Sequence, residues 1–308
     1  MSLVHRIRYR AERDYFRWKY NRVARRVLAT RPLARGTLPF ILLSMVQKRD
    51  VAPYLVALKS FAHFVNPARV VVVCDPSIDQ DDRATFKRHV PHIELRDAHE
   101  FTHQDIPRGG TWERLFAISG YAEDSYVIQL DADTVTVHAI PEVLDAVRAN
   151  AGFVISEMAD APARTLQATH ENAKQWMGES SPHIQALAEF HMVDAGLPPA
   201  ARYIRGCSGF TGFPRGSGMR DTMTDYSRRM TAKLGEGWKR WGTEQVTSNY
   251  LISNMPGTRP LPFPKYGTPD DATADTAFYH FIGSMRFNNN RYEMATRHAL
   301  GLINGAAA

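Results

Sequence analysis

A short apolar run that ends in two carboxylates constrains the fold of this chain more than any other feature. Residues 125–134 read Ser-Tyr-Val-Ile-Gln-Leu-Asp-Ala-Asp-Thr, which is typical of a strand covered on both faces in a largely parallel sheet. Ligands bind at the carboxyl ends of the strands in open α/β sheets. Asp131 and Asp133 are therefore candidates to hold a divalent ion such as Mg²⁺ beside a phosphorylated ligand, although strand-end aspartates also form ordinary turns.

The first half of the chain alternates strand-like and helix-like segments. The sequence pattern predicts strands at 38–45, 69–74 and 93–95 and helices at 50–64, 78–90 and 113–121. Such alternation produces βαβ units and a mostly parallel sheet, so we expect a Rossmann-like α/β half. The chain has neither Gly-x-Gly-x-x-Gly after the first strand nor Gly-x-x-x-x-Gly-Lys-Ser/Thr, which removes the main support for a dinucleotide-binding or P-loop protein.

The second half is less regular. We expect a strand at 152–157, a polar helical insertion at 158–200, a glycine-interrupted strand at 203–213, helices near 217–234 and 245–254, and a proline-rich loop at 256–269. Glycines inside a strand often mark the close approach of a ligand or of another backbone. Long loops in compact domains are usually functional or disordered.

Positive charge is concentrated in residues 1–36. This segment has eleven Lys and Arg residues against Glu12 and Asp14, a net charge of +9, so the rest of the +6 chain carries −3. Apolar and aromatic residues recur among the arginines at helical spacing, which predicts a basic amphipathic helix. Such a helix either lies on an anionic lipid surface or packs its aromatic side chains on its own domain. Nucleic acid is a weaker alternative, because no other segment resembles a nucleic-acid-binding module.

Composition favours a globular protein of the reducing cytosol. The chain has 308 residues, 44% of them hydrophobic, enough for one large α/β core. It has no uncharged apolar run of about 18 residues and no apolar secretory signal. Cys74 and Cys207, its two cysteines, provide neither a disulfide framework nor a metal-binding spacing.

Four motifs, in order along the chain, carry a resemblance to a known family. Leu-Phe-Ala-Ile-Ser-Gly-Tyr at 115–121, preceded by Arg114, leads to the strand that ends in Asp-Ala-Asp. Cys-Ser-Gly-Phe at 207–210, Glu-Gln-Val-Thr-Ser-Asn at 244–249 and His-Phe-Ile-Gly-Ser-Met-Arg at 280–286 follow. Over about residues 37–287 the chain resembles the metal-dependent glycosyltransferases with the GT-A fold, particularly the family-eight, glycogenin-like and galactosyltransferase-like group.

The resemblance implies a Rossmann-like GT-A fold: a mixed, mostly parallel central sheet flanked by helices, here with a basic N-terminal helical arm. It also implies a set of site residues. The metal ligands for Mn²⁺ or Mg²⁺ are Asp131, Asp133 and His280. The donor nucleotide is bound by Arg286, Gly283, Asp75 and Ser208, and the reacting sugar and diphosphate are contacted by Arg114, Glu244 and Gln245.

Three positions depart from the family pattern. Arg286 replaces a lysine, Glu244 replaces an aspartate, and Asp50 stands where an aromatic residue commonly lies near the nucleobase. Ordinary structural roles remain open for several candidates. Glu244 suits the N-terminus of a helix, Asp75 before Pro76 suits a turn, and a lone histidine such as His280 is often a core residue.

The function implied is transfer of a hexose from a nucleoside diphosphate sugar, in the first instance a UDP-sugar, to a glycan or glycolipid acceptor with retention at the anomeric carbon. The alternatives are a catalytically idle nucleotide- or glycan-binding protein and a nucleotide-sugar phosphohydrolase. We expect an arm at 1–36, a transferase domain at 37–287 whose insertion at 158–200 faces the acceptor, and a tail at 288–308. The expected location is the cytoplasm, free or at the inner face of a membrane, without a nucleic-acid partner.

Overall fold

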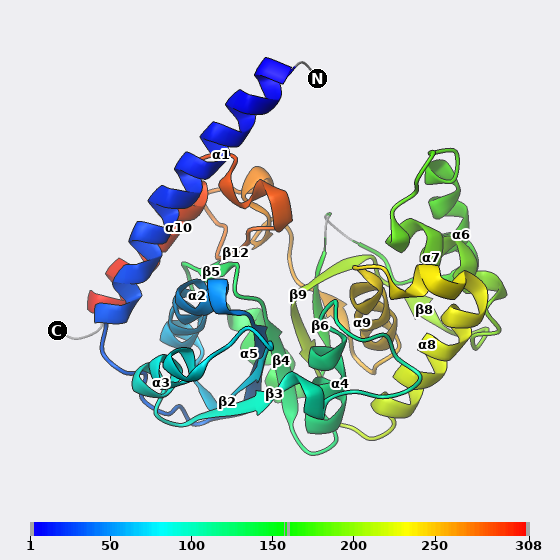
Figure 1. Cartoon of the computed structure of the whole chain (residues 1–308). Coiled ribbons are helices and arrows are strands. Elements are labelled where there is room, and N and C mark those ends of the chain that lie inside the picture. The colour runs from blue at the N-terminus through cyan, green and yellow to red at the C-terminus, as the bar shows by residue number, and fades with distance from the viewer. Residues whose placement is uncertain (1–2, 157, 159–160, 306–308) are drawn as a thin grey trace. The chain divides into compact units, whose positions relative to one another are not determined.

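The computed structural model describes residues 3–156, 158 and 161–305. Its helices (Figure 1) are α1 Leu3–Ala24, α2 Val51–Phe64, α3 Gln80–His89, α4 Trp112–Tyr121, α5 Pro141–Ala149, α6 Leu166–Ala173, α7 Ile184–His191, α8 Met219–Leu234, α9 Thr243–Ser253 and α10 Arg291–Gly305. Its strands are β1 Leu38–Val46, β2 Pro67–Cys74, β3 Ile93–Asp97, β4 Tyr126–Leu130, β5 Thr134–Thr136, β6 Phe153–Ser156, β7 Arg164–Thr165, β8 Arg202–Tyr203, β9 Gly206–Phe213, β10 Arg259–Pro260, β11 Tyr266–Gly267 and β12 Phe278–His280.

The strands confirm the predicted α/β architecture. A seven-stranded mixed sheet has the order β10-β6-β9-β4-β1-β2-β3, a three-stranded sheet has the order β11-β12-β5, and β7 pairs with β8. The chain divides into two compact units. The first unit comprises Met1–Leu95, Leu130–Pro141 and Pro264–Ala308, and the second comprises Arg96–Gln129 and Glu142–Phe263.

The core of the first unit is built on parallel β1 and β2, which run in register from Ile41 opposite Arg69 to Val46 opposite Cys74. Their central residues are buried, as expected for apolar runs covered on both faces. The α2 side chains pack into this core with eleven buried residues. Asp79 is the N-cap of α3, and its side chain forms a reciprocal capping box with Asp82.

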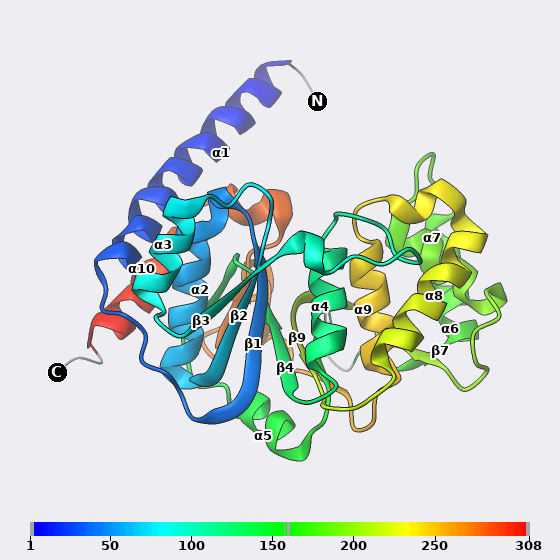
Figure 2. The same cartoon turned by 60° about the horizontal axis from the view of Figure 1, so that its bottom comes forward.

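The second unit contains β6, β9 and β10 with helices α4 and α6–α9. Its strand β9 and these helices are labelled in Figure 2. β9 runs antiparallel to β6, and its glycines allow close approach. A Cβ on Gly212 would lie 2.2 Å from the ring of Phe153, and one on Gly206 would lie 2.7 Å from the carbonyl oxygen of Ile155. These glycines therefore allow neighbouring parts of the chain to approach closely. Close approach of protein or of a ligand was expected at such positions.

The N-terminal arm begins with α1, and two opposite faces of this helix differ. On one face Tyr20, Val23 and Ala24 are buried. Tyr20 stacks on Tyr292 of α10 with ring centroids 3.8 Å apart, and Lys19 pairs with Glu293 at 3.0 Å. This face thus packs on the rest of its own unit. On the opposite face large apolar side chains are exposed, including Ile7, Tyr15 and Trp18.

Most predicted elements lie within a few residues of the observed ones, and two segments hold more structure than expected. The C-terminal segment, for which the sequence suggests only a tail, contains α10, which packs against α1 and α2. The proline-rich segment contains β10 and β11. The insertion expected at 158–200 contains α6 and α7. Residue 157 of the expected strand and residues 159 and 160 of the insertion lie outside the described residues. None of the described helices combines the length and the apolar character required to cross a bilayer.

Candidate functional site

Asp131 and Asp133 lie in the turn that follows β4. All five residues of this strand are buried, and the hydroxyl of Ser44 on β1 donates to the carbonyl oxygen of Leu130 at 2.7 Å. The turn is closed by Thr134, whose hydroxyl donates to the carbonyl oxygen of Asp131 at 2.8 Å. The strand end that the sequence predicts is therefore the start of a short, hydrogen-bonded loop carrying both carboxylates.

The pairing of β12 with β5 brings His280 to this loop. β12 runs antiparallel to β5 with His280 opposite Thr134, and the amide of Phe281 donates to the carbonyl oxygen of Asp133 at 2.9 Å. Successive side chains on a strand point to opposite faces. The register thus fixes the face of β12 on which His280 lies. It brings His280 close to Asp133, although the two residues are 147 positions apart in the sequence.

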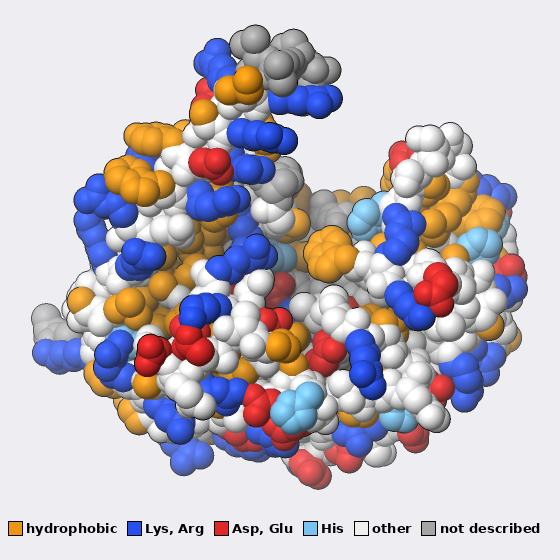
Figure 3. Space-filling view, in the orientation of Figure 1, with side chains coloured by type: hydrophobic (Ala, Val, Ile, Leu, Met, Phe, Trp, Pro, Cys, Tyr) orange, Lys and Arg blue, Asp and Glu red, His pale blue; other side chains and the backbone are white. Residues whose placement is uncertain are grey.

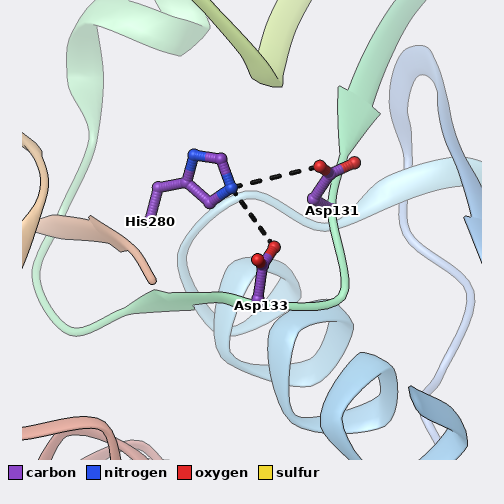
Figure 4. Close-up of side chains that lie close together, drawn as sticks. All are labelled: Asp131, Asp133 and His280. Carbon is purple, nitrogen blue, oxygen red and sulfur yellow. Dashed lines mark ion pairs between the residues drawn. The ribbon is translucent and has the colours of Figure 1, made fainter. Parts of the chain in front are cut away.

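The three side chains converge (Figure 4). Nε2 of His280 lies 3.2 Å from Oδ1 of Asp133 and 4.0 Å from Oδ2 of Asp131. One candidate ligand atom from each residue lies within 4.8 Å of the others. Asp133 and His280 are each only 5% exposed, whereas Asp131 is 26% exposed, so the cluster opens on the side of Asp131.

Arg286 adds a positive charge to the cluster. Its Nη2 pairs with Oδ2 of Asp133, while its Nε donates to the carbonyl oxygen of Phe281 at 3.1 Å. Burial by itself would raise the pKa of Asp133, but His280 and Arg286 outweigh it and lower that pKa below its ordinary value. These neighbours therefore favour the carboxylate form, which a metal ligand requires.

This donor set fits a divalent ion. Two carboxylates and one imidazole form a mixed oxygen and nitrogen shell that suits Mn²⁺ as well as Mg²⁺. The second oxygen of Asp133 is already held by Arg286, which orients the carboxylate and leaves Oδ1 on the side of His280. The residues that would hold the ion are thus Asp131, Asp133 and His280.

The other candidates in the first unit have simpler surroundings. Gly283 has a φ of +47°, and among the described residues no atom lies within 4 Å of the position of a Cβ. Asp75 accepts hydrogen bonds from the amide and the hydroxyl of Ser77 at 2.9 and 2.6 Å, which is the geometry of a turn. A contact between Asp75 and a nucleobase stays a prediction.

The remaining four candidates meet in the second unit. Nη2 of Arg114 lies 3.1 Å from Oε1 of Glu244, and both side chains are at most 4% exposed. Oε2 of Glu244 accepts from the hydroxyls of Thr111 and Ser208 at 3.2 and 3.3 Å. The amide of Ser208 donates to Oε1 of Gln245 at 3.4 Å. Arg114 therefore pairs with Glu244, and the contact with the sugar or diphosphate that the resemblance implies for Arg114 stays a prediction.

A polar chain that the sequence did not reveal orients Gln245. Nε2 of Gln245 donates to Oε1 of Gln185 at 3.1 Å, and Nε2 of Gln185 donates to Glu189 at 3.0 Å. Glu189 also pairs with Arg205, whose guanidinium lies 4.6 Å from the ring centroid of Trp176. The sequence feature that could have indicated this contact is the spacing of Gln185 and Glu189, which are four residues apart in an otherwise mostly apolar helix.

Asp50 also makes a contact that the sequence did not predict. It precedes α2 without capping that helix through its side chain. Its Oδ1 lies 3.6 Å from Nη1 of Arg286. Burial raises the pKa of Asp50, and the neighbouring Arg286 opposes that shift. No local motif signals this contact, because the two residues are 236 positions apart.

Comparison with known proteins shows the fold. No protein-family model and no curated protein sequence matches the chain. Among solved structures, it is similar to the bifunctional glycosyltransferase WbbM in its apo form, with a TM-score of 0.51 and 14% identity over 86% of this chain and 52% of WbbM. It is also similar to the glycosyltransferase GlyE of Streptococcus pneumoniae TIGR4, with a TM-score of 0.50 and 9% identity over 87% of this chain and 63% of GlyE.

The chain spans less than two thirds of the length of either protein. At these identities the likeness concerns the fold alone. The GT-A type of α/β fold expected from the sequence motifs is thereby confirmed.

Proposed function

We propose that this protein is a metal-dependent glycosyltransferase that moves a hexose from a nucleoside diphosphate sugar, which we take to be a UDP-sugar, to a glycan or glycolipid acceptor. One observation carries the proposal. In a fold of the glycosyltransferase type, Asp131, Asp133 and His280 converge within 4.8 Å at the end of a central strand, where such sheets bind ligands. Fold alone does not imply function, so the weight rests on this cluster.

The chemistry of sugar transfer explains the cluster. Negative charge develops on the leaving diphosphate as the bond to the sugar breaks, and fixed positive charge stabilises it more in the transition state than in the ground state. A bound divalent ion supplies most of that charge as a Lewis acid. Arg286 adds a planar donor fork that can grip two phosphate oxygens, and its contacts with Asp133, Asp50 and the carbonyl oxygen of Phe281 orient it at the site.

The assignment of the second unit rests on the sequence motifs. We assign Glu244 and Gln245 to the hydroxyls and reacting face of the donor sugar, and retention of the anomeric configuration belongs to the same proposal. The orientation of Gln245 by Gln185 and Ser208 supports a recognition role, because its amide dipole is fixed by partners on both sides.

A donor panel tests the proposal. The protein should release nucleoside diphosphate from one UDP-sugar with Mn²⁺, slowly as hydrolysis alone and faster with an acceptor glycan or glycolipid, and lose this activity in EDTA. Release of sugar phosphate and nucleoside monophosphate would identify a phosphohydrolase. Nucleotide binding without turnover of any donor would identify an idle binding protein. Proton NMR of the first-formed product then reads the anomeric outcome, and inversion would refute retention.

The proposal includes an anionic membrane surface as the partner of α1. Ile7, Tyr15 and Trp18 are 60%, 54% and 54% exposed, and at 100° per residue they fall within one quarter of the helix circumference. This stripe lies on the side opposite Tyr20 and Val23, which pack on the first unit. Figure 3 shows Lys and Arg side chains along α1 with hydrophobic side chains between them. Aromatic rings flanked by arginines are typical of helices that lie in the interface of acidic lipids.

Vesicle binding checks this partner. We expect the protein to bind vesicles containing phosphatidylserine at low salt, to release them as ionic strength rises, and to ignore neutral vesicles. Because burying three such side chains is worth at least about 3 kcal/mol, replacing Ile7, Tyr15 and Trp18 together by Ser should weaken binding about a hundredfold. These point changes are preferable to deleting the helix, since Tyr20 stacks on Tyr292, whose hydroxyl donates to the carbonyl oxygen of Ala132 at 3.4 Å.

Trp241→Ser is the matched control, because Trp241 is 72% exposed but lies on the second unit. It should leave vesicle binding unchanged. Equal binding by the triple variant and the wild type would refute α1 as the membrane surface.

A further inference from the structure

Arg286 lies between two carboxylates that come from distant parts of the first unit. Its Nη2 contacts Oδ2 of Asp133, and its Nη1 lies 3.6 Å from Oδ1 of Asp50. The third anchor is the hydrogen bond from Nε to the carbonyl oxygen of Phe281. Asp133 and Asp50 are only 5% and 12% exposed, so this guanidinium is enclosed by partners on three sides.

Because Arg286 contacts Asp133, its positive charge would repel an ion bound to the same carboxylate. A divalent cation held by Asp131, Asp133 and His280 would share a carboxylate with a guanidinium, and like charges at such short range repel strongly in a partly buried site. Binding of the ion would therefore weaken the ion pair between Asp133 and Arg286. The contact with Asp50 does not involve a metal ligand, so it persists when the ion binds.

We propose that Arg286 is a built-in counter-ion that shields Asp133 until the ion and the donor diphosphate bind, and that Asp50 is the positioning residue that keeps Arg286 at the site after its release from Asp133. The inference rests on the metal site of the proposed function. It adds that the ion and the diphosphate bind cooperatively, because the ion frees the guanidinium and the diphosphate then accepts it. Such coupling is reciprocal.

Binding of Mn²⁺ alone gives the most direct test. We measure free Mn²⁺ by electron paramagnetic resonance during titration of the full chain without nucleotide. Arg286→Gln should bind Mn²⁺ more tightly than the wild type, on the order of tenfold, which is within the usual range of coupling between sites. Arg286→Lys, which keeps the charge, should bind nearly as the wild type does.

Arg291→Gln is the matched control for net charge. Arg291 begins α10, five residues beyond Arg286, and pairs with the exposed Asp270 at 2.8 Å. Its replacement should leave Mn²⁺ affinity unchanged. Unchanged or weaker Mn²⁺ binding by Arg286→Gln would overturn the counter-ion role.

The role of Asp50 is tested with UDP at saturating Mn²⁺ by titration calorimetry. Arg286→Gln should weaken UDP binding on the order of tenfold, and Asp50→Asn should weaken it several-fold. In the double variant the change at Asp50 should have no further effect, because the residue that it positions is gone. Equal losses from Asp50→Asn in both backgrounds would show a merely structural role and overturn the positioning role.

The two proposals fail differently. If the wild type binds no Mn²⁺, or if Asp133→Asn leaves Mn²⁺ binding intact, the metal site of the proposed function is wrong and this inference is wrong with it. If Asp133→Asn abolishes Mn²⁺ binding but Arg286→Gln does not strengthen it, the metal site stands and only the counter-ion role is refuted.

Discussion

Asp133→Asn should lower donor turnover by about a thousandfold while the protein stays folded. The substitution keeps the shape of the side chain but removes a charge from the proposed ion site. Loss of about 4 kcal/mol of transition-state stabilisation corresponds to this factor. The measurement is turnover of the preferred donor with Mn²⁺, with circular dichroism to verify the fold.

The effect of Asp133→Asn on stability depends on the ion pairs of Arg286. Asp133 pairs with Arg286 in a nearly buried position, and removing one partner of a buried pair is usually expensive. Asp50 remains beside Arg286 at 3.6 Å, so the guanidinium keeps a counter-charge. Asp145→Asn is the control, since Asp145 is 72% exposed and pairs with Arg148. Nearly normal turnover in Asp133→Asn would refute the site.

Arg114→Met should destabilise the protein by about 3–5 kcal/mol. The substitution removes the positive charge of Arg114 from the carboxylate of Glu244, which is 3% exposed, and the hydroxyls of Thr111 and Ser208 that also donate to it are uncharged. For a unit of this size the loss corresponds to a fall in Tm of about 10 °C. Thermal unfolding followed by circular dichroism measures it.

Two further variants separate the pair from its surroundings. Arg114→Met combined with Glu244→Gln should recover part of the lost stability, because the buried charge is removed together with its partner. Arg148→Met breaks a pair whose side chains are both 72% exposed, and it should change stability by less than about 1 kcal/mol. A loss of similar size in Arg114→Met and Arg148→Met would show that the buried pair is not a stabilising contact.

The buried pair also changes how the catalytic assignment is tested. Since Arg114 and Glu244 support each other, loss of activity in either single variant combines a structural and a chemical effect. Gln245→Leu is a cleaner probe of donor recognition, because the hydrogen bonds of Gln245 to Ser208 and Gln185 are between neutral groups.

Elements with a local cause could be predicted from the amino-acid sequence. The apolar run at 126–130 forms a strand because β-branched and apolar side chains suit a surface buried on both faces. The alternation of strands and helices in the first half follows from hydrophobic periodicity. Asp131 and Asp133 follow from the same local pattern, since the residues after a buried strand lie at the edge of the sheet. Family motifs then identified His280 and Arg286 as companions.

Which distant side chains meet depends on how the elements pack in three dimensions. The register of β12 against β5 delivers His280 to the two aspartates. Asp50 meets Arg286, and Arg114 meets Glu244, across separations of 236 and 130 residues. The packing of Tyr20 on Tyr292 covers one face of α1 and leaves Ile7, Tyr15 and Trp18 exposed on the opposite face. Local sequence specifies φ, ψ and the face of each element, whereas these contacts depend on how the elements pack, which is a property of the whole unit.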